Sequence, residues 1–190
     1  MDKRIYNFSA GPATLPLPAL EEAQRDLVSL PGVGMSVMEI SHRSKWFSEI
    51  LEGAKSNLKT LLNLPDHYRV LFIQGGATLQ FSMVAMNFLR GTGKTAEYII
   101  TGSWGKKALA EAQKEGAVNK IWDNKEQNYV RVPRPDEYRI NPDTAYVHFT
   151  SNETIQGVEF FEEPEAGDVP VVCDASSDFL CRPFDPRKYA

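Results

Sequence analysis

From residue 69 onward, short apolar segments alternate with segments of helical spacing. We expect strands at five apolar segments rich in β-branched and aromatic residues, at 69–73, 97–101, 119–122, 145–150 and 169–174. Apolar residues at helical spacing predict helices over about 79–89 and 106–116, between the first three strands. Strands that alternate with helices are typical of a parallel sheet with helices on its faces. The sequence therefore predicts an α/β fold with a mostly parallel sheet.

The first part of the chain has a different pattern. Glycine and proline in "NFSAGPATLP" favour an extended N-terminal segment over residues 1–16. Two helices are predicted next, one from Pro18 to the "PGVG" segment and one from about Trp46 to "NLPDHY". We expect one domain over residues 17–190, after the extended segment.

The composition limits the classes of partner. The chain has 190 residues, 42% of them apolar, and a net charge of −4, so no basic field favours nucleic acid or an anionic membrane. No stretch has the length of a membrane span or the character of a signal peptide. The two cysteines, Cys173 and Cys181, form neither a metal-ligand cluster nor a disulfide framework. We expect a cytoplasmic protein without a bound metal.

Small polar residues follow four of the predicted strands. The segments "QGGAT", "TGSW", "TSNET" and "DASSD" begin at residues 74, 101, 150 and 174. In parallel α/β sheets, ligands bind in the crevice at the carboxyl ends of the strands. Glycine, hydroxyl and carboxylate groups at these ends predict a site for a small anionic, aromatic or hydrogen-bonding ligand.

The glycine pair in "QGGAT" has two interpretations. Gly75 and Gly76 would let a phosphate approach the N–H groups and the dipole of the next helix, with Thr78 as a further donor. The alternative is a tight strand-to-helix turn that needs positive φ angles. A second glycine-rich segment, "RGTGKT", follows a predicted helix and has Phe88 where a nucleotide-binding P-loop needs glycine, so it is interpreted as a surface loop.

Three further side chains follow strand ends. Trp104 could stack against an aromatic ligand or cover the core. Thr154 could bond to a ligand hydroxyl or belong to a polar loop with capping residues. Asp174 carries a charge that is costly to bury unpaired, and it would keep a neighbouring pyridine nitrogen protonated, because the charged ring gains a partner. With a phosphate-binding turn, these groups match one aromatic phosphorylated cofactor.

His42 and Arg43 precede the second predicted helix. Such a pair is either solvated at the surface or binds a ligand, with the arginine forked onto a substrate carboxylate or phosphate. The segment itself leaves both interpretations open.

Longer motifs in the chain resemble a known enzyme family. They are "NFSAGPATLP", "SVMEISHRS", "FIQGGATLQFSMVAMNF", "GSWGKKALAEA", "TSNETIQGVEF" and "CDASSDFLCRPFD". Together they resemble the phosphoserine aminotransferases, pyridoxal-phosphate enzymes of the class V, fold-type I group, over all 190 residues. The resemblance implies that residues 17–190 are part of the cofactor-binding large domain of that fold, which is incomplete in this chain.

The resemblance also implies roles for single residues. Trp104 would stack on the pyridine ring of pyridoxal 5'-phosphate, Thr154 would bond near the ring hydroxyl, and Asp174 would pair with the ring nitrogen. The full set of implied cofactor contacts is Gly76, Ala77, Thr78, Trp104, Thr154 and Asp174. The resemblance implies that His42 and Arg43 bind the anionic ends of substrates, Arg43 in particular the carboxylate of glutamate. It also implies that Ser9 and Ala10 line the substrate site.

Two departures from the family pattern bear on activity. Many members have arginine where this chain has Thr78, which puts one contact to the substrate phosphate in question. The Schiff-base lysine of the family follows the Asp174 strand in an Ala-Gln-Lys-Asn-like segment that residues 1–190 do not include. Lys188 is a poor substitute because it lies in a polar turn. We therefore expect little or no transamination from residues 1–190 alone.

The implied reaction moves the amino group between L-glutamate and 3-phosphohydroxypyruvate, giving 2-oxoglutarate and O-phospho-L-serine in serine biosynthesis. The resemblance also implies a homodimer, and 4-phosphohydroxythreonine of pyridoxine biosynthesis as a second product. Two alternatives remain open. One is another class V enzyme, such as an alanine–glyoxylate or serine–pyruvate aminotransferase or a cysteine desulfurase. The other is a non-catalytic form that binds cofactor or a partner chain. A nucleotide-binding α/β module is disfavoured by the P-loop spacing.

Overall fold

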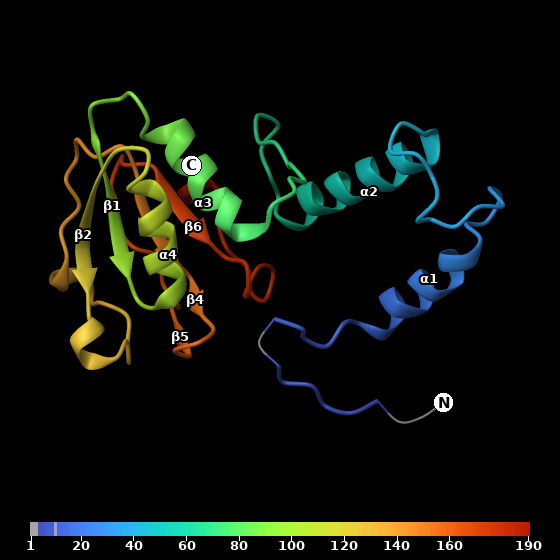
Figure 1. Ribbon diagram of the computed structural model, residues 1–190, viewed down its shortest axis with the longest axis horizontal. Coiled ribbons are helices and arrows are strands. Elements are labelled where there is room, and N and C mark those ends of the chain that lie inside the picture. Colours follow the sequence, from blue (N-terminus) through green and yellow to red (C-terminus); the bar gives the residue numbers. More distant parts are fainter. Residues whose placement is uncertain (1–3, 10) are drawn as a thin grey trace. The chain divides into compact units, whose positions relative to one another are not determined.

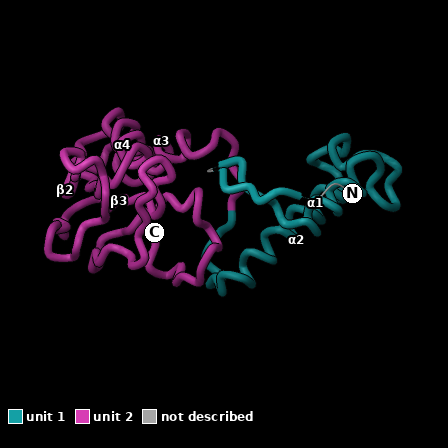
Figure 2. The backbone as a smooth tube through the Cα atoms, turned by 90° about the horizontal axis from the view of Figure 1, so that it is seen from below, with its two compact units in different colours: residues 1–70 teal, residues 71–190 magenta. Residues whose placement is uncertain are grey.

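The computed structural model of the chain describes residues 4–9 and 11–190. The chain divides into two compact units, residues 1–70 and 71–190, which Figure 2 shows in separate colours. Each unit has its own secondary structure.

The first unit contains two helices, α1 (Leu17–Val28) and α2 (Lys45–Leu61). Both confirm the helices predicted from apolar spacing. The α2 helix begins where Ser44, in extended conformation, accepts a hydrogen bond of 3.2 Å from the backbone N–H of Phe47 through its Oγ. No residue of α1 or α2 is buried, so the apolar stripes of both helices remain accessible.

The second unit is built on a four-stranded sheet with the order β2-β1-β3-β6. All neighbouring strands run parallel, which confirms the predicted α/β architecture. Two helices, α3 and α4, cover one face of this sheet (Figure 1). The bounds are α3 (Gly76–Phe88), β1 (Thr95–Ile100), α4 (Ser103–Ala112), β2 (Ala117–Asp123), β3 (Val147–Thr150) and β6 (Val171–Asp174).

Smaller elements connect these strands. A short antiparallel hairpin of β4 (Asn152–Glu153) and β5 (Val158–Glu159) follows β3, and it was not predicted. The described residues also form single-turn 3₁₀ helices at η1 (Lys125–Gln127), η2 (Pro135–Glu137) and η3 (Pro186–Lys188). None of the helices formed by the described residues combines the length and the apolar character that crossing a bilayer requires.

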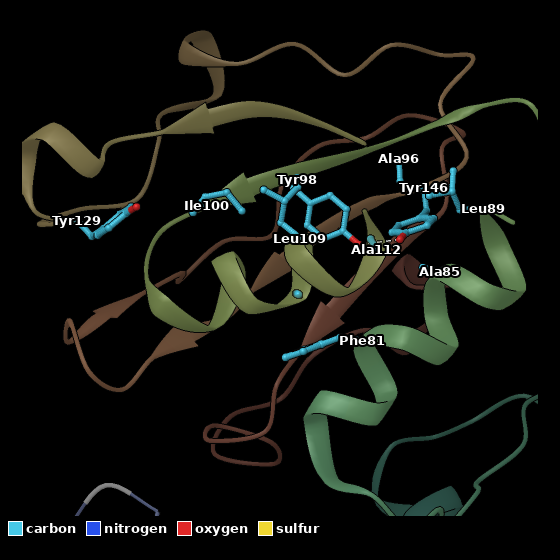
Figure 3. Packing of buried hydrophobic residues seen from close by; sticks show 11 residues of the cluster. Phe81, Ala85, Leu89, Ala96, Tyr98, Ile100, Leu109, Ala112, Tyr129 and Tyr146 are labelled. Carbon is cyan, nitrogen blue, oxygen red and sulfur yellow. Dashed lines mark hydrogen bonds between the residues drawn. The ribbon is translucent and has the colours of Figure 1, made fainter. Parts of the chain in front are cut away.

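Side chains from alternate positions of the strands form the core on the two faces of the sheet. On the helix-covered face, the hydroxyl groups of Tyr98 and Tyr146 form a buried hydrogen bond of 2.6 Å (Figure 3). On the other face, Phe149 packs edge-on against Phe160, with 5.1 Å between ring centroids. The hairpin strand β5 leads into Phe160, so the hairpin is anchored to this second face.

The strand predicted over residues 69–73 is wrong. The segment has no strand assignment, and Leu71, Phe72 and Ile73 are 70%, 59% and 47% exposed. A strand needs a neighbour to bond its backbone groups, and none of the described strands pairs with this segment. An apolar segment favours burial, but its sequence does not guarantee a neighbouring strand to which its backbone can bond.

Candidate active site

Strand register places Asp174 on the helix-covered face of the sheet. Thr150 of β3 is the partner of Asp174 in β6, and His148 is the partner of Val172. Successive side chains of a strand point to opposite faces, so His148, Thr150 and Asp174 share one face. His148 stacks on Tyr98 with 5.0 Å between ring centroids, which identifies that face as the one under α3 and α4.

Helix α3 begins at the same edge of the sheet. Its last residue, Phe88, contacts Tyr146 with 6.1 Å between ring centroids, whereas Phe81 contacts His148 at 5.9 Å. Helix α3 therefore runs antiparallel to β3. Its first turn lies at the carboxyl ends of the strands. Helix α4 begins directly after β1 and packs beside α3. Both helix N-termini thus face the edge that carries Asp174.

The glycine pair forms the N-terminus of α3. Gly75 caps the helix with φ of 105°, and a Cβ atom there would clash with the side chain of Leu79, 2.8 Å from its Cβ. The tight turn is confirmed, and only glycine fits it. No side chain caps this helix, so the N–H groups at Gly76, Ala77 and Thr78 retain the donors and the positive dipole end that attract anions. The two interpretations of the turn are therefore compatible.

Trp104 and Thr154 are joined by a hydrogen bond. Trp104 lies in the first turn of α4, and its Nε1 donates to Oγ1 of Thr154 at 3.0 Å. The indole nitrogen can only donate, so the threonine oxygen accepts and its hydroxyl proton remains available for a further acceptor. The ammonium of Lys107 lies 4.2 Å from the centroid of the indole ring. The half-buried indole and the threonine hydroxyl thus form one unit at the strand ends.

Glu153 is the main residue that sequence reasoning did not assign to the site. Its carboxylate is fully buried and accepts hydrogen bonds from the backbone N–H groups of Trp104 at 2.8 Å and Gly105 at 2.7 Å. Burial raises the pKa of this carboxyl, and the two backbone donors oppose that rise. Glu153 lies in strand β4 and its side chain bonds the first turn of α4, so the segment is a hairpin and not the polar loop of the alternative interpretation. Its target helix lies about fifty positions upstream, so no local pattern could indicate the contact.

Gln156 ties the same loop to the start of α4. Its Oε1 accepts from the backbone N–H of Ser103 at 3.1 Å, and its Nε2 donates to the hydroxyl of Ser103 at 2.9 Å. Gly102 leaves the room for this contact, since a Cβ atom there would lie 2.5 Å from Oε1 of Gln156 and 2.6 Å from Cδ of Glu153. The loop after β3 and the first turn of α4 are therefore closely fitted.

Asp174 has small hydroxyl and backbone groups as its hydrogen-bond partners. Its Oδ1 accepts from the backbone N–H of Ser176 at 3.1 Å and from the hydroxyl of Ser176 at 2.5 Å. The ion pairs formed by the described residues do not include Asp174. Burial lowers the pKa of His148, on the same face, to about 4 although Asp174 raises it, so this histidine is neutral near pH 7. A half-buried carboxylate of this kind fits a protonated heteroaromatic nitrogen.

Comparison with known proteins shows the family. The sequence profile of the family described as aminotransferase class-V matches residues 5–190. The chain belongs to the class-V aminotransferases. It is 54% identical to a phosphoserine aminotransferase of Rhodopirellula baltica over 98% of this chain and 50% of that protein. It is 51% identical to the phosphoserine aminotransferase of Pseudomonas fluorescens over 100% of this chain and 52% of that protein.

Solved structures of class-V aminotransferases share the fold. The phosphoserine aminotransferase from Bacillus circulans subsp. alkalophilus superimposes with a TM-score of 0.92 at 47% identity, covering 98% of this chain and 51% of that chain. The phosphoserine aminotransferase from Trichomonas vaginalis, with bound pyridoxal phosphate (PLP), gives a TM-score of 0.90 at 42% identity. The match covers 98% of this chain and 55% of that chain. The chain spans about half the length of the curated relatives it matches.

The residues predicted to bind substrate belong to the first unit of this class-V chain. Ser9 is exposed, and its backbone N–H donates to Oδ1 of Asn7 at 3.0 Å. His42 and Arg43 are exposed in the turn before α2, where the backbone N–H of Arg43 donates to Oγ of Ser41 at 3.2 Å. Ala10 lies outside the described residues. The roles of these four residues remain predictions.

One cluster has metal-ligand chemistry. Glu159, Asp178 and Cys181 could each offer one atom, and these atoms lie within 4.8 Å of one another. The guanidinium of Arg182 pairs with Glu159 at 2.7 Å and with Asp178 at 3.8 Å. Because a cation already neutralises both carboxylates, the cluster is better suited to a salt bridge than to a metal ion.

Proposed function

We propose that this chain forms the cofactor-binding part of a PLP-dependent phosphoserine aminotransferase. The observation that carries the proposal is the set of groups at one sheet edge, where an uncapped helix N-terminus, the Trp104–Thr154 pair and the charge of Asp174 occur together. The names of the relatives support the same activity, and one similar solved structure is named as PLP-bound.

Each group suits one part of pyridoxal phosphate. The N–H groups at Gly76 and Ala77, with the Thr78 hydroxyl, would bind the phosphate. The Trp104 indole would stack on the ring, and the free hydroxyl proton of Thr154 would be donated to the ring oxygen. Asp174 would hold the proton on the ring nitrogen. When bound, pyridoxal phosphate supplies an electron-withdrawing ring that stabilises negative charge developing at the substrate α-carbon.

The proposed substrates are L-glutamate and 3-phosphohydroxypyruvate, with O-phospho-L-serine and 2-oxoglutarate as products. Arg43 would fork onto the glutamate carboxylate, and Ser9, Ala10 and His42 would contact the remaining anionic groups. The proposal includes a homodimer in the cytoplasm that serves serine biosynthesis and also forms 4-phosphohydroxythreonine for pyridoxine. Thr78 replaces an arginine common in the family, so fewer charges would be available to the substrate phosphate.

Acceptor selectivity tests this proposal. The PLP-loaded protein that contains this chain is supplied with glutamate and one acceptor at a time, and 2-oxoglutarate formation is measured. The expected result is transfer to 3-phosphohydroxypyruvate that exceeds transfer to pyruvate or glyoxylate. A preference for pyruvate or glyoxylate would assign a different class-V activity. PLP binding without amino transfer to any acceptor would favour the alternative that the protein binds the cofactor without catalysing transfer.

Residues 1–190 alone provide a second comparison. We expect them to transfer the amino group poorly, because the resemblance places the proton-moving lysine outside them. Turnover equal to that of the protein containing the lysine would contradict this expectation.

A further inference from the structure

Glu153 connects the two side chains that are proposed to contact the cofactor ring. One carboxylate oxygen accepts the backbone N–H of Trp104, and the other accepts the N–H of Gly105. Thr154 follows Glu153 in the chain, and its Oγ1 accepts the indole N–H of Trp104. The three residues therefore form a closed ring of covalent and hydrogen bonds. A shift of Glu153 must displace the indole and the threonine hydroxyl together.

The surroundings of Glu153 leave it little freedom. Its side chain is 0% exposed, and Gly102 and Gly105 both lie against its carboxylate. Two hydrogen bonds between Gln156 and Ser103 fix the turn of the same hairpin. Two acceptor atoms meet two donor N–H groups at the start of α4, so the geometry requires a side chain that accepts at both positions.

We infer that Glu153 is a positioning residue for the cofactor, fixing the plane of the Trp104 indole and the direction of the Thr154 hydroxyl. This inference rests on the proposed function, because it concerns the same cofactor site. Glutamine in its place would keep the volume but would set an amide NH₂ group against a backbone N–H. The first turn of α4 would then rotate to separate the amide NH₂ from the backbone N–H. The Trp104 indole would no longer lie in the plane suited to stacking on the pyridine ring.

Glu97 offers a matched control. It is also a buried carboxylate of the second unit, 5% exposed, and its Oε2 accepts the backbone N–H of Asn141 at 3.0 Å. It lies in β1 at an alternating position with Ile99, on the face opposite to α3 and α4. Glu97→Gln is therefore the same change at another buried carboxylate, where one amide oxygen is enough to accept the single N–H bond, and it does not touch Trp104 or Thr154.

The experiment compares Glu153→Gln and Glu97→Gln in the complete protein that contains this chain. PLP affinity and the visible circular dichroism of bound PLP are measured, together with the melting temperature. We expect Glu153→Gln to weaken PLP binding about tenfold or more and to change the dichroism band, since an unmet buried donor has an effect of that order. Glu97→Gln should lower only the melting temperature. Equal PLP affinity and dichroism for both variants would overturn the inference.

A second readout separates the positioning role from the proposed function. In a background in which Trp46, Trp122 and any tryptophan outside residues 1–190 are replaced by phenylalanine, emission reports Trp104 alone. If the parent protein takes up no PLP, the proposed function fails. Emission tests the positioning of Trp104 separately from PLP binding: a shift in Glu153→Gln but not in Glu97→Gln shows that Glu153 orients the indole, and unchanged emission overturns the inference. Should Glu153→Gln fail to fold, Glu153→Asp must shift the emission more than Glu97→Gln does.

Discussion

The indole nitrogen of Trp104 donates a hydrogen bond of 3.0 Å to the hydroxyl oxygen of Thr154, which lies fifty positions later in the chain. This bond joins the start of α4 to the β4–β5 hairpin, and it keeps the threonine proton from pointing at the indole nitrogen. Two side chains that the sequence suggests as separate ligand contacts are thus one hydrogen-bonded unit.

Replacing Trp104 separates the stacking role from the hydrogen bond. Trp104→Phe keeps an aromatic face but loses the N–H donor, so PLP affinity should fall by about 3- to 10-fold, the usual effect of one hydrogen bond. Trp104→Leu should weaken binding further because it also removes the aromatic face. PLP titration followed by absorbance measures both, with Trp46→Phe in the first unit as control. Equal affinities for the phenylalanine and leucine variants would argue against stacking.

Removing the charge of Asp174 should weaken the hold on the ring nitrogen. Asp174→Asn is nearly isosteric, and a hydrogen bond to a charged group is worth roughly 1.5–3 kcal/mol, so we expect PLP affinity to fall by about 10- to 150-fold. The rate of amino transfer should fall as well, because a neutral ring nitrogen withdraws electrons poorly. Isothermal titration and the glutamate assay test this. The exposed Asp143→Asn is the control, and a comparable loss there would contradict a specific role for Asp174.

A methyl group at Gly102 should destabilise the contact between α4 and the Glu153 loop. Its Cβ atom would lie 2.5 Å from Gln156 and 2.6 Å from Glu153, and overpacking of this kind costs about 1–3 kcal/mol. Gly53→Ala in α2 is the matched change, since nothing lies within 4 Å of a Cβ atom there. A glycine-to-alanine change in a helix interior should stabilise by roughly 0.5–1 kcal/mol. Urea unfolding should therefore give effects of opposite sign, and a neutral Gly102→Ala would mean that the loop moves freely.

His148 should make the second unit sensitive to acid. Burial lowers its pKa from 6.5 to about 4 in the folded chain, so the unfolded chain takes up a proton first as the pH falls. The stabilisation is complete above pH 6.5 and is lost as the pH falls toward 4, by about 3 kcal/mol. His148→Phe should remove this part of the pH dependence, measured as the free energy of unfolding at several pH values. The exposed His67→Gln should leave the slope unchanged, and a parental slope in His148→Phe would contradict the assignment.

The parallel sheet could be predicted because its central strands form short, mainly apolar runs and its helices have a clear period. Residues 69–73 are also apolar, but they pair with no strand among the described residues. The sequence of an apolar segment does not show whether a neighbouring strand is present. The β4–β5 hairpin could not be predicted, because strands of two residues each carry no periodic signal. Glycine, hydroxyl and carboxylate groups at the strand ends indicated the candidate site. The role of Glu153 depends on a contact with α4 that only the folded chain creates.

The division into two units coincides with a division of proposed roles. All six residues proposed to contact the cofactor lie within residues 71–190, and all four proposed to contact substrate lie within residues 1–70. Apart from Thr78, whose position bears on the substrate phosphate, selection for a new amino-group acceptor would therefore act on the first unit while the chemistry of the second stays constant. Exchanging the first unit between related chains would be a direct route to altered selectivity in the laboratory.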